Sequence, residues 1–195
     1  MASINGITVK AVKEFRGHEG EPLYQGNIYL GNKKIGWWSQ DSHGGCDNIH
    51  LDQPYIVTKL EHKVKELNRD KEETHERSDG SKYVLDYSLD MMFGDLMVMY
   101  EDEKTYRAAV KNGFAGVLLV TDGYHVFGWN LSEETMMYSN DAILRKFTNA
   151  IEDGKKKNKF FKEDEFYKHK VKIYRGLDDF NIGTKIKLEE IKGGM

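Results

Sequence analysis

The first fifty residues alternate apolar and polar positions with a period of two, which is typical of strands that have one buried face. The alternation runs over residues 7–12, 24–30 and 34–39. Gly31 and Asn32 separate the last two runs, and both residue types tolerate the positive φ angles of a tight hairpin turn. The pattern therefore predicts an antiparallel meander.

Two helices are predicted to follow the meander. Apolar residues recur every three or four positions over residues 53–73, which indicates an amphipathic helix. The charged residues 71–81 then predict a mobile loop. A second apolar stripe begins after Ser88, which is a good capping residue, and stops at Asn112 and Gly113. We expect this second helix to lie across the sheet as the main element of the core.

The last third of the chain predicts a second hairpin and one more helix. In residues 114–130 the apolar run 117–120 is typical of a buried strand, and Asp122 and Gly123 suit the turn. The helix would be capped by Ser139 or Asn140 and ended by Gly154. After it, residues 155–159 are expected to be exposed and flexible, and residues 171–175 offer a further strand.

Together these elements predict a single α+β domain with a mainly antiparallel sheet of about five strands, packed against two or three helices. The core would span residues 1–154. Residues 155–195 would form a basic C-terminal extension that contributes at most one strand.

Composition narrows the class of protein. Hydrophobic residues make up 39% of the chain and charged residues 31%, and no apolar run approaches the roughly 20 residues of a membrane span. The N-terminus lacks the basic and apolar regions of a signal peptide. Cys46 is the single cysteine, so no intramolecular disulfide can form. We therefore expect a cytoplasmic protein that does not associate with membranes.

Charge bears on the choice of partner. The net charge is −3, with acidic residues in excess up to residue 154 and basic residues in excess after it. An acidic body repels phosphate, which favours a protein partner over nucleic acid or a nucleotide. The basic tail docks on the body or stays solvated, or it forms a phosphate-binding arm.

Two motifs of the meander carry candidate binding residues. Arg16 and His18 lie in a glycine-rich turn, where a guanidinium group and bare backbone amides can bind an anion, unless the segment is only a turn. Trp37 and Trp38 are neighbours in a strand, so one should enter the core and the other should face outward. The outward ring would stack on a base or fill a partner's pocket, or it would be covered by a helix or the tail.

The sequence gives less support to metal or catalytic chemistry. His43, Cys46, Asp47 and His50 are close enough in sequence to surround an ion or to pair a thiol with a base, but they match no recognised motif and read as a turn. A carboxylate cluster on the second helix suits either Mg²⁺ or, as we expect, an ordinary solvated face. No phosphate loop or dinucleotide fingerprint is present, and we expect no cofactor. The cluster comprises Asp86, Asp90, Asp95, Glu101, Asp102 and Glu103.

Three segments resemble small uncharacterised phage and prophage accessory proteins. They are Phe-Arg-Gly-His-Glu-Gly at residues 15–20, Leu-Asp-Met-Met-Phe-Gly-Asp-Leu at residues 89–96 and, more loosely, Lys-Asn-Gly-Phe-Ala-Gly-Val-Leu at residues 111–118. The likeness covers roughly residues 5–125. It implies an origin in a virus or mobile element, and therefore a place in the host cytoplasm, and it implies no particular activity.

The leading hypothesis is a non-enzymatic phage or prophage protein that binds a host or viral macromolecule, with inhibition of a host defence system as one form of that role. One rival is a protein that sequesters a nucleotide, enclosed by a homodimer. The other is a metal-dependent hydrolase of nucleic acid. The candidate binding residues are Arg16, His18, Trp37, Trp38, His43, Lys155, Lys156 and Lys157.

Overall fold

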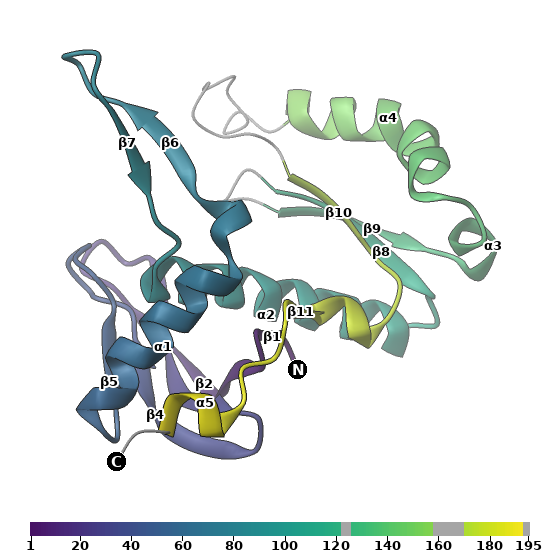
Figure 1. The fold of residues 1–195 in the computed structure, drawn as a ribbon. Helices are drawn as coiled ribbons and strands as arrows, with labels where there is room; N and C mark the ends of the chain where they lie inside the picture. The colour runs from purple at the N-terminus through teal and green to yellow at the C-terminus, as the bar shows by residue number, and fades with distance from the viewer. Residues whose placement is uncertain (122–125, 158–169, 193–195) are drawn as a thin grey trace. The chain divides into compact units, whose positions relative to one another are not determined.

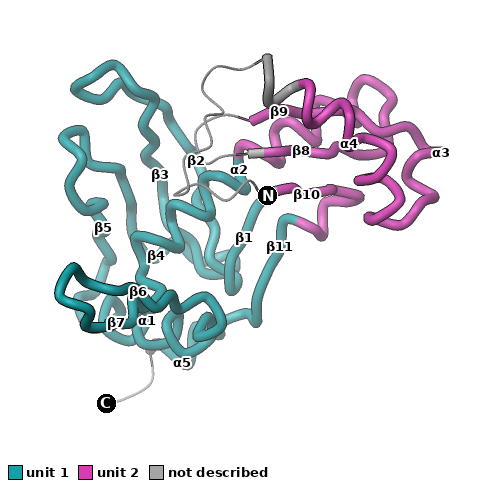
Figure 2. Tube along the Cα trace, turned by 90° about the horizontal axis from the view of Figure 1, so that it is seen from above, with its two compact units in different colours: residues 1–100, 180–195 teal, residues 101–179 magenta. Residues whose placement is uncertain are grey.

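The structure is a computed structural model that describes residues 1–121, 126–157 and 170–192 (Figure 1). It mixes helices and strands, which confirms the predicted α+β class. The chain divides into two compact units, shown in different colours in Figure 2. Unit 1 comprises residues 1–100 and 180–195, and unit 2 comprises residues 101–179. The expected single sheet is joined by two smaller sheets, because the strands at residues 116–121, 126–131 and 170–174 pair with one another and those at residues 73–76 and 82–85 form a hairpin.

Unit 1 is built on a six-stranded sheet with the strand order β11-β1-β2-β3-β4-β5. Neighbouring strands are antiparallel, except that β1 and β11 run parallel. The predicted meander is confirmed as the central hairpins, whereas β5 was missed. The strands are β1 (Ser3–Ile4), β2 (Ile7–Arg16), β3 (Pro22–Leu30), β4 (Lys33–Ser39), β5 (Asn48–Leu51) and β11 (Asn181–Ile182).

Helices cover one face of this sheet, which we call the inner face. Helix α1 (Pro54–Leu67) buries Leu60 and Val64 completely. The first half of α2 (Leu89–Lys111) buries Phe93, whose ring stacks on that of Trp38 with 5.5 Å between the centroids. The expectation that α2 is a main core element is thus confirmed, and Ser88 accepts a hydrogen bond from the Met91 amide at its start. The short helix α5 (Leu188–Lys192) contacts α1.

A two-stranded hairpin occupies the segment for which the sequence predicted a mobile loop, so that prediction is wrong. Helix α1 ends at Leu67, earlier than predicted, and a 3-10 turn, η1 (Arg69–Lys71), leads into β6 (Glu73–Glu76) and β7 (Lys82–Leu85). The strands pair antiparallel, with His75 stacked on Tyr83. Polar composition hid the hairpin, because its cross-strand pairs do not need an apolar face.

Unit 2 contains a three-stranded antiparallel sheet with the order β10-β8-β9. The predicted hairpin is confirmed as β8 (Gly116–Thr121) and β9 (Val126–Leu131), and its turn at Asp122 and Gly123 lies outside the described residues. The strand predicted near the C-terminus is β10 (Lys170–Tyr174). As predicted, residues 117–120 are buried in the central strand.

Two helices accompany this sheet. The short helix α3 (Glu133–Met136) was not predicted. Helix α4 (Asn140–Lys157) is capped by Ser139, whose hydroxyl accepts from the Ala142 amide at 3.3 Å, and it buries Ile143 against Leu118. It continues three residues beyond Gly154, where the sequence predicted its end, because a glycine weakens a helix without stopping it.

Candidate binding face

The face of the six-stranded sheet opposite the helices carries polar and aromatic side chains, and we call it the outer face. Cross-strand pairing aligns its residues in three rows across β2, β3, β4 and β5. The middle row is Lys10, Asn27, Trp37 and His50. The complete set is Thr8, Lys10, Lys13, Gln25, Asn27, Tyr29, Lys34, Trp37, Ser39, Asn48 and His50.

The two adjacent tryptophans point to opposite sides of β4, as the sequence predicted. Trp38 is fully buried on the inner face, and its indole Nε1 donates to the Asp47 carboxylate at 2.7 Å. It belongs to the core and is not available for binding. Trp37 is 44% exposed on the outer face, where its ring stacks on that of His50 with 5.7 Å between centroids. Of the two tryptophans, Trp37 is therefore the one that a partner can reach.

Three lysines and no carboxylate belong to the aligned rows. A β-bulge between Lys10 and Lys13 brings both side chains to the outer face, although an odd spacing would otherwise separate them. Ala11 forms the bulge with a φ of +54°. The Lys10 ammonium lies 4.4 Å from the centre of the Tyr29 ring, a cation–π contact. The outer face is thus locally cationic on a chain that is acidic overall.

Two predicted binding residues meet where the β2–β3 and β4–β5 loops adjoin. The rings of His18 and His43 stack with 5.6 Å between centroids, and the His18 amide donates to the Ser42 carbonyl at 3.1 Å. Arg16 lies close in sequence, but its guanidinium donates to the Gly20 carbonyl and stands 3.8 Å from Glu14. Arg16 therefore holds its own turn together, which weakens the case for it as an anion ligand.

The two aspartates of the β4–β5 loop support the loop itself. Backbone hydrogen bonds, led by that from Gly45 at 2.7 Å, lower the pKa of Asp41 below its ordinary value. Burial raises the pKa of Asp47, an effect that the hydrogen bond from Trp38 opposes and the nearby negative charges of Asp90 and Asp41 reinforce. Each carboxylate is thus engaged by neighbouring donors and does not face an open site.

The residues considered for a metal or thiol site do not gather. His43 stacks on His18 and His50 stacks on Trp37, whereas Cys46 is an exposed free thiol. Within the part of the chain that the structure describes, no group of three or more histidine, cysteine, aspartate or glutamate side chains is arranged to hold an ion.

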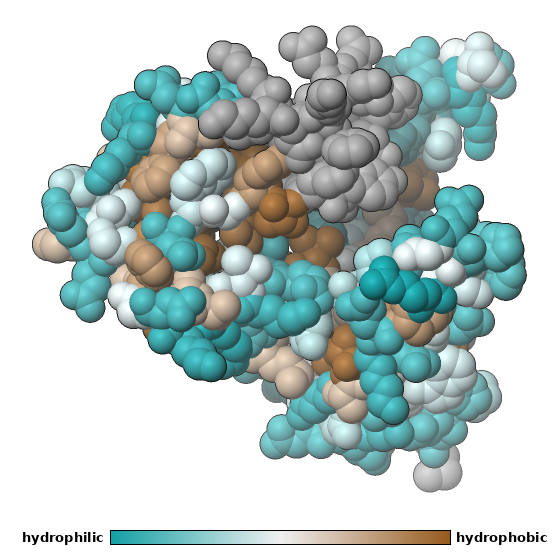
Figure 3. Space-filling view, turned by 180° about the vertical axis from the view of Figure 1, so that it is seen from behind, coloured by the Kyte–Doolittle hydropathy of each residue, from teal (hydrophilic) through white to brown (hydrophobic). Residues whose placement is uncertain are grey.

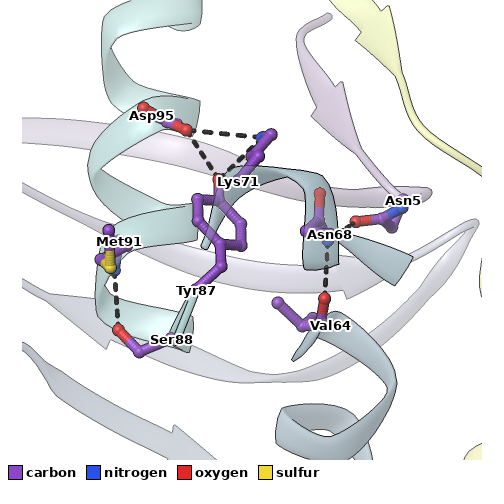
Figure 4. Close-up of polar contacts among 8 residues, drawn as sticks. All are labelled: Asn5, Val64, Asn68, Lys71, Tyr87, Ser88, Met91 and Asp95. Atoms are coloured by element: carbon purple, nitrogen blue, oxygen red, sulfur yellow. Dashed lines mark hydrogen bonds and ion pairs between the residues drawn. The ribbon is translucent and has the colours of Figure 1, made fainter. Parts of the chain in front are cut away.

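The carboxylates of α2 correct the interpretation of this cluster as a solvated face. Asp95 accepts a hydrogen bond from the Tyr87 hydroxyl at 2.7 Å, and the Lys71 ammonium lies 3.5 Å from the same oxygen (Figure 4). In unit 2, Asp102 is buried and accepts from Tyr174 at 2.6 Å and from Lys172 at 2.9 Å.

Both tyrosines of these groupings remain protonated donors. Burial, reinforced by the hydrogen-bonded aspartate, raises the pKa of Tyr87 and of Tyr174 far above the ordinary value. Glu103 is likewise buried and pairs with Arg107. The sequence missed this burial because carboxylates at helical spacing usually face water.

The lysine-rich segment adds no site that can be described. The backbone of Lys155, Lys156 and Lys157 forms the last turn of α4, and their side chains, like residues 158 and 159, lie outside the described residues. No helix in the described ranges is long and apolar enough to cross a membrane. Hydrophilic side chains dominate the surface seen in Figure 3, with apolar ones in patches between them.

The sequence identified Trp37 as a candidate binding residue, but it did not identify most of the residues that lie around Trp37 on the outer face. Lys10, Asn27 and Tyr29 occupy the polar positions of the same alternation that predicted the strands, so the signal was present. What the sequence did not give is the register that aligns them. Comparison with protein-family models, curated proteins and solved structures finds no match for this chain.

Proposed function

We propose that this chain is a non-enzymatic binding protein that recognises a host or viral macromolecule through the outer face of its six-stranded sheet. The observation that carries the proposal is the exposed Trp37, set between Asn27 and His50 in a row that ends at Lys10. A large exposed aromatic ring among polar side chains is typical of an interaction surface. The opposite face of the sheet is occupied by the core.

The resemblance to phage and prophage accessory proteins supports a setting in the host cytoplasm. Interference with a host defence system is a form of macromolecular binding that this setting would favour. The geometry favours neither rival function, because Arg16 is engaged within its own turn and the loop carboxylates support the loop.

The proposal is tested by quantitative capture with the tagged chain in a bacterial host, followed by identification of bound protein and nucleic acid. Trp37→Ala is compared with Tyr55→Ala, which removes an aromatic ring of similar exposure (48%) from α1. We expect a stoichiometric partner that Trp37→Ala loses and Tyr55→Ala keeps, and the same dependence when purified components are mixed. Equal capture of the partner by the wild-type chain, Trp37→Ala and Tyr55→Ala would contradict the use of the outer face.

Thermal unfolding with a nucleotide panel, Mg²⁺ and Zn²⁺ tests the rival functions. A ligand at a hundred times its dissociation constant stabilises a protein by about 2.7 kcal/mol. We expect no such shift, and a specific shift with one nucleotide or ion would favour the corresponding rival.

A further inference from the structure

We propose that the partner of the outer face is single-stranded nucleic acid, with a base stacked on Trp37 and phosphates paired with the flanking lysines. This inference rests on the proposed function, since it uses the same face and names the class of partner. Overall acidity favoured a protein partner at the sequence level, but the residues that align on the outer face have a different balance of charge.

The placement of the cations favours phosphate over protein. Lys10 lies in the row of Trp37. The other two lysines lie in the two adjacent rows: Lys13 in the row of Gln25 and Ser39, and Lys34 in the row of Thr8 and Tyr29. Positive charge therefore lies on β2, on the side of the indole away from β5, and along β4 at Lys34, and no carboxylate in these rows neutralises it. Lysine is depleted from the centres of protein–protein interfaces, whereas lysines beside stacking aromatics characterise surfaces that bind single strands.

The neutral side chains fit the edges of bases. Gln25, Asn27 and Asn48 supply amide donors and acceptors beside the indole, and Tyr29 supplies a second ring. Unpaired bases present both their stacking faces and their hydrogen-bonding edges, which a duplex withholds. Neighbouring strands lie about 4.8 Å apart, so the face spans about 14 Å from β2 to β5. That width accommodates the two or three bases that an open sheet usually stacks.

Binding of this kind should weaken with salt by a predictable amount. Three phosphates neutralised by three lysines give a slope of about −2 in a plot of log affinity against log salt concentration for a single strand. Removing one lysine should reduce this slope by about 0.7. Because a duplex withholds the stacking faces of its bases from the indole, duplex DNA of the same length should bind more weakly than the single strand.

Fluorescence anisotropy with labelled 15-nucleotide oligo(dT) and oligo(U), and with a duplex of equal length, tests the inference on the full chain. Trp37→Ala should weaken single-strand binding by about 5- to 150-fold, the loss of one stacked base. Trp37→Phe should retain most of the affinity because it keeps an aromatic face. Lys13→Ala and Lys34→Ala should each reduce the salt slope, whereas Lys82→Ala, on β7 outside the six-stranded sheet, should not.

The outcomes separate this inference from the proposed function. Circular dichroism and thermal unfolding first establish that each variant is folded. No single-strand binding at low salt, equal binding of duplex, or equal losses in Trp37→Ala and Tyr55→Ala would overturn the inference. If cellular capture still depends on Trp37, survives nuclease treatment and yields a protein, the proposed function stands and the nucleic-acid partner is rejected. If neither capture nor oligonucleotide binding depends on Trp37, both are rejected.

Discussion

At the scale of single residues, the Trp38–Asp47 pair shows how a polar contact fixes a large side chain in the core. The indole ring is buried against Phe93, and its only polar atom donates to the Asp47 carboxylate at 2.7 Å. A buried indole N–H needs an acceptor. The acceptor is itself partly removed from water, so the carboxylate form is disfavoured, which is why burial raises the pKa of Asp47.

This balance predicts the effect of Asp47→Asn. The amide oxygen can still accept from Trp38, but no charge has to be buried. The pKa of Asp47 is raised in the folded chain. The wild-type chain therefore has its full stability below the ordinary aspartate pKa, and it loses part of that stability as the pH rises from there through the raised pKa of the folded state. Asp47→Asn should therefore be more stable than wild type at pH 7, and the gap should close as the solution is acidified.

Urea unfolding between pH 7 and pH 3.5 measures this difference. Asp52→Asn removes an exposed carboxylate just beyond β5 and controls for the change in net charge. A variant that is less stable than wild type at pH 7 would show that the charged hydrogen bond to Trp38 outweighs the cost of burial.

At the scale of elements, α2 carries two groupings of the same kind, one in each unit. In each, an aspartate of the helix accepts from a tyrosine hydroxyl and lies near a lysine: Asp95 with Tyr87 and Lys71, and Asp102 with Tyr174 and Lys172. The two aspartates are seven residues apart in the sequence. The Lys71 ammonium also lies 4.2 Å from the centre of the Tyr87 ring, a cation–π contact.

Tyr87→Phe should therefore destabilise the chain although it keeps the ring. The change removes the Tyr87 donor from the Asp95 carboxylate, which the Lys71 ammonium also contacts, and losing a donor to a charged acceptor costs about 1–3 kcal/mol. Tyr83→Phe, at the 39% exposed position on β7, is the matched control and should cost much less. Chemical denaturation monitored by circular dichroism compares the two. Equal, small losses in both variants would show that solvent replaces the Tyr87 hydrogen bond.

Elements with a regular apolar pattern were predictable, and those held by polar pairing were not. The alternation in β2, β3 and β4 predicted both the strands and the opposite directions of Trp37 and Trp38. The β6–β7 hairpin was missed because β6 contains only polar residues and therefore shows no apolar alternation. The buried Asp102 was missed because its partners, Tyr174 and Lys172, lie about 70 residues away in sequence, where no local pattern can reveal them.

The binding face was predictable only in part for the same reason. The outward ring of Trp37 follows from local alternation, and the meeting of His18 with His43 follows from neither loop alone. The alignment of Lys13 with the other outer-face residues depends on a β-bulge with a positive φ at Ala11. Alanine rarely adopts a positive φ, so the sequence does not predict a bulge at this position. The domain boundary predicted at residue 154 stays a prediction.

At the scale of the whole molecule, the chain leaves unit 1 after residue 100 and returns to it at residue 180. The returning segment is built into the unit. Strand β11 pairs with β1, the Ser3 hydroxyl donates to the Asn181 side chain at 2.8 Å, and the Asn5 amide group donates to the Thr184 carbonyl at 3.0 Å. The buried Asn5 side chain also accepts from Asn68 at 2.9 Å, at the end of α1 (Figure 4).

The returning segment begins with a buried ring, which gives a test of how much unit 1 depends on it. Phe180, at the end of the 3-10 turn η2 (Leu177–Phe180), is fully buried, whereas Leu177 in the same turn is 42% exposed. Phe180→Ala removes a large core side chain and should cost about 3–5 kcal/mol, while Leu177→Ala should cost less than about 1 kcal/mol. Urea unfolding followed by tryptophan fluorescence, in a Trp129→Phe background that removes the tryptophan of unit 2, reports on unit 1 through Trp37 and Trp38. Similar small losses in the two variants would mean that the segment is a dispensable appendage, whereas the expected contrast would make the outer face dependent on residues at both ends of the chain.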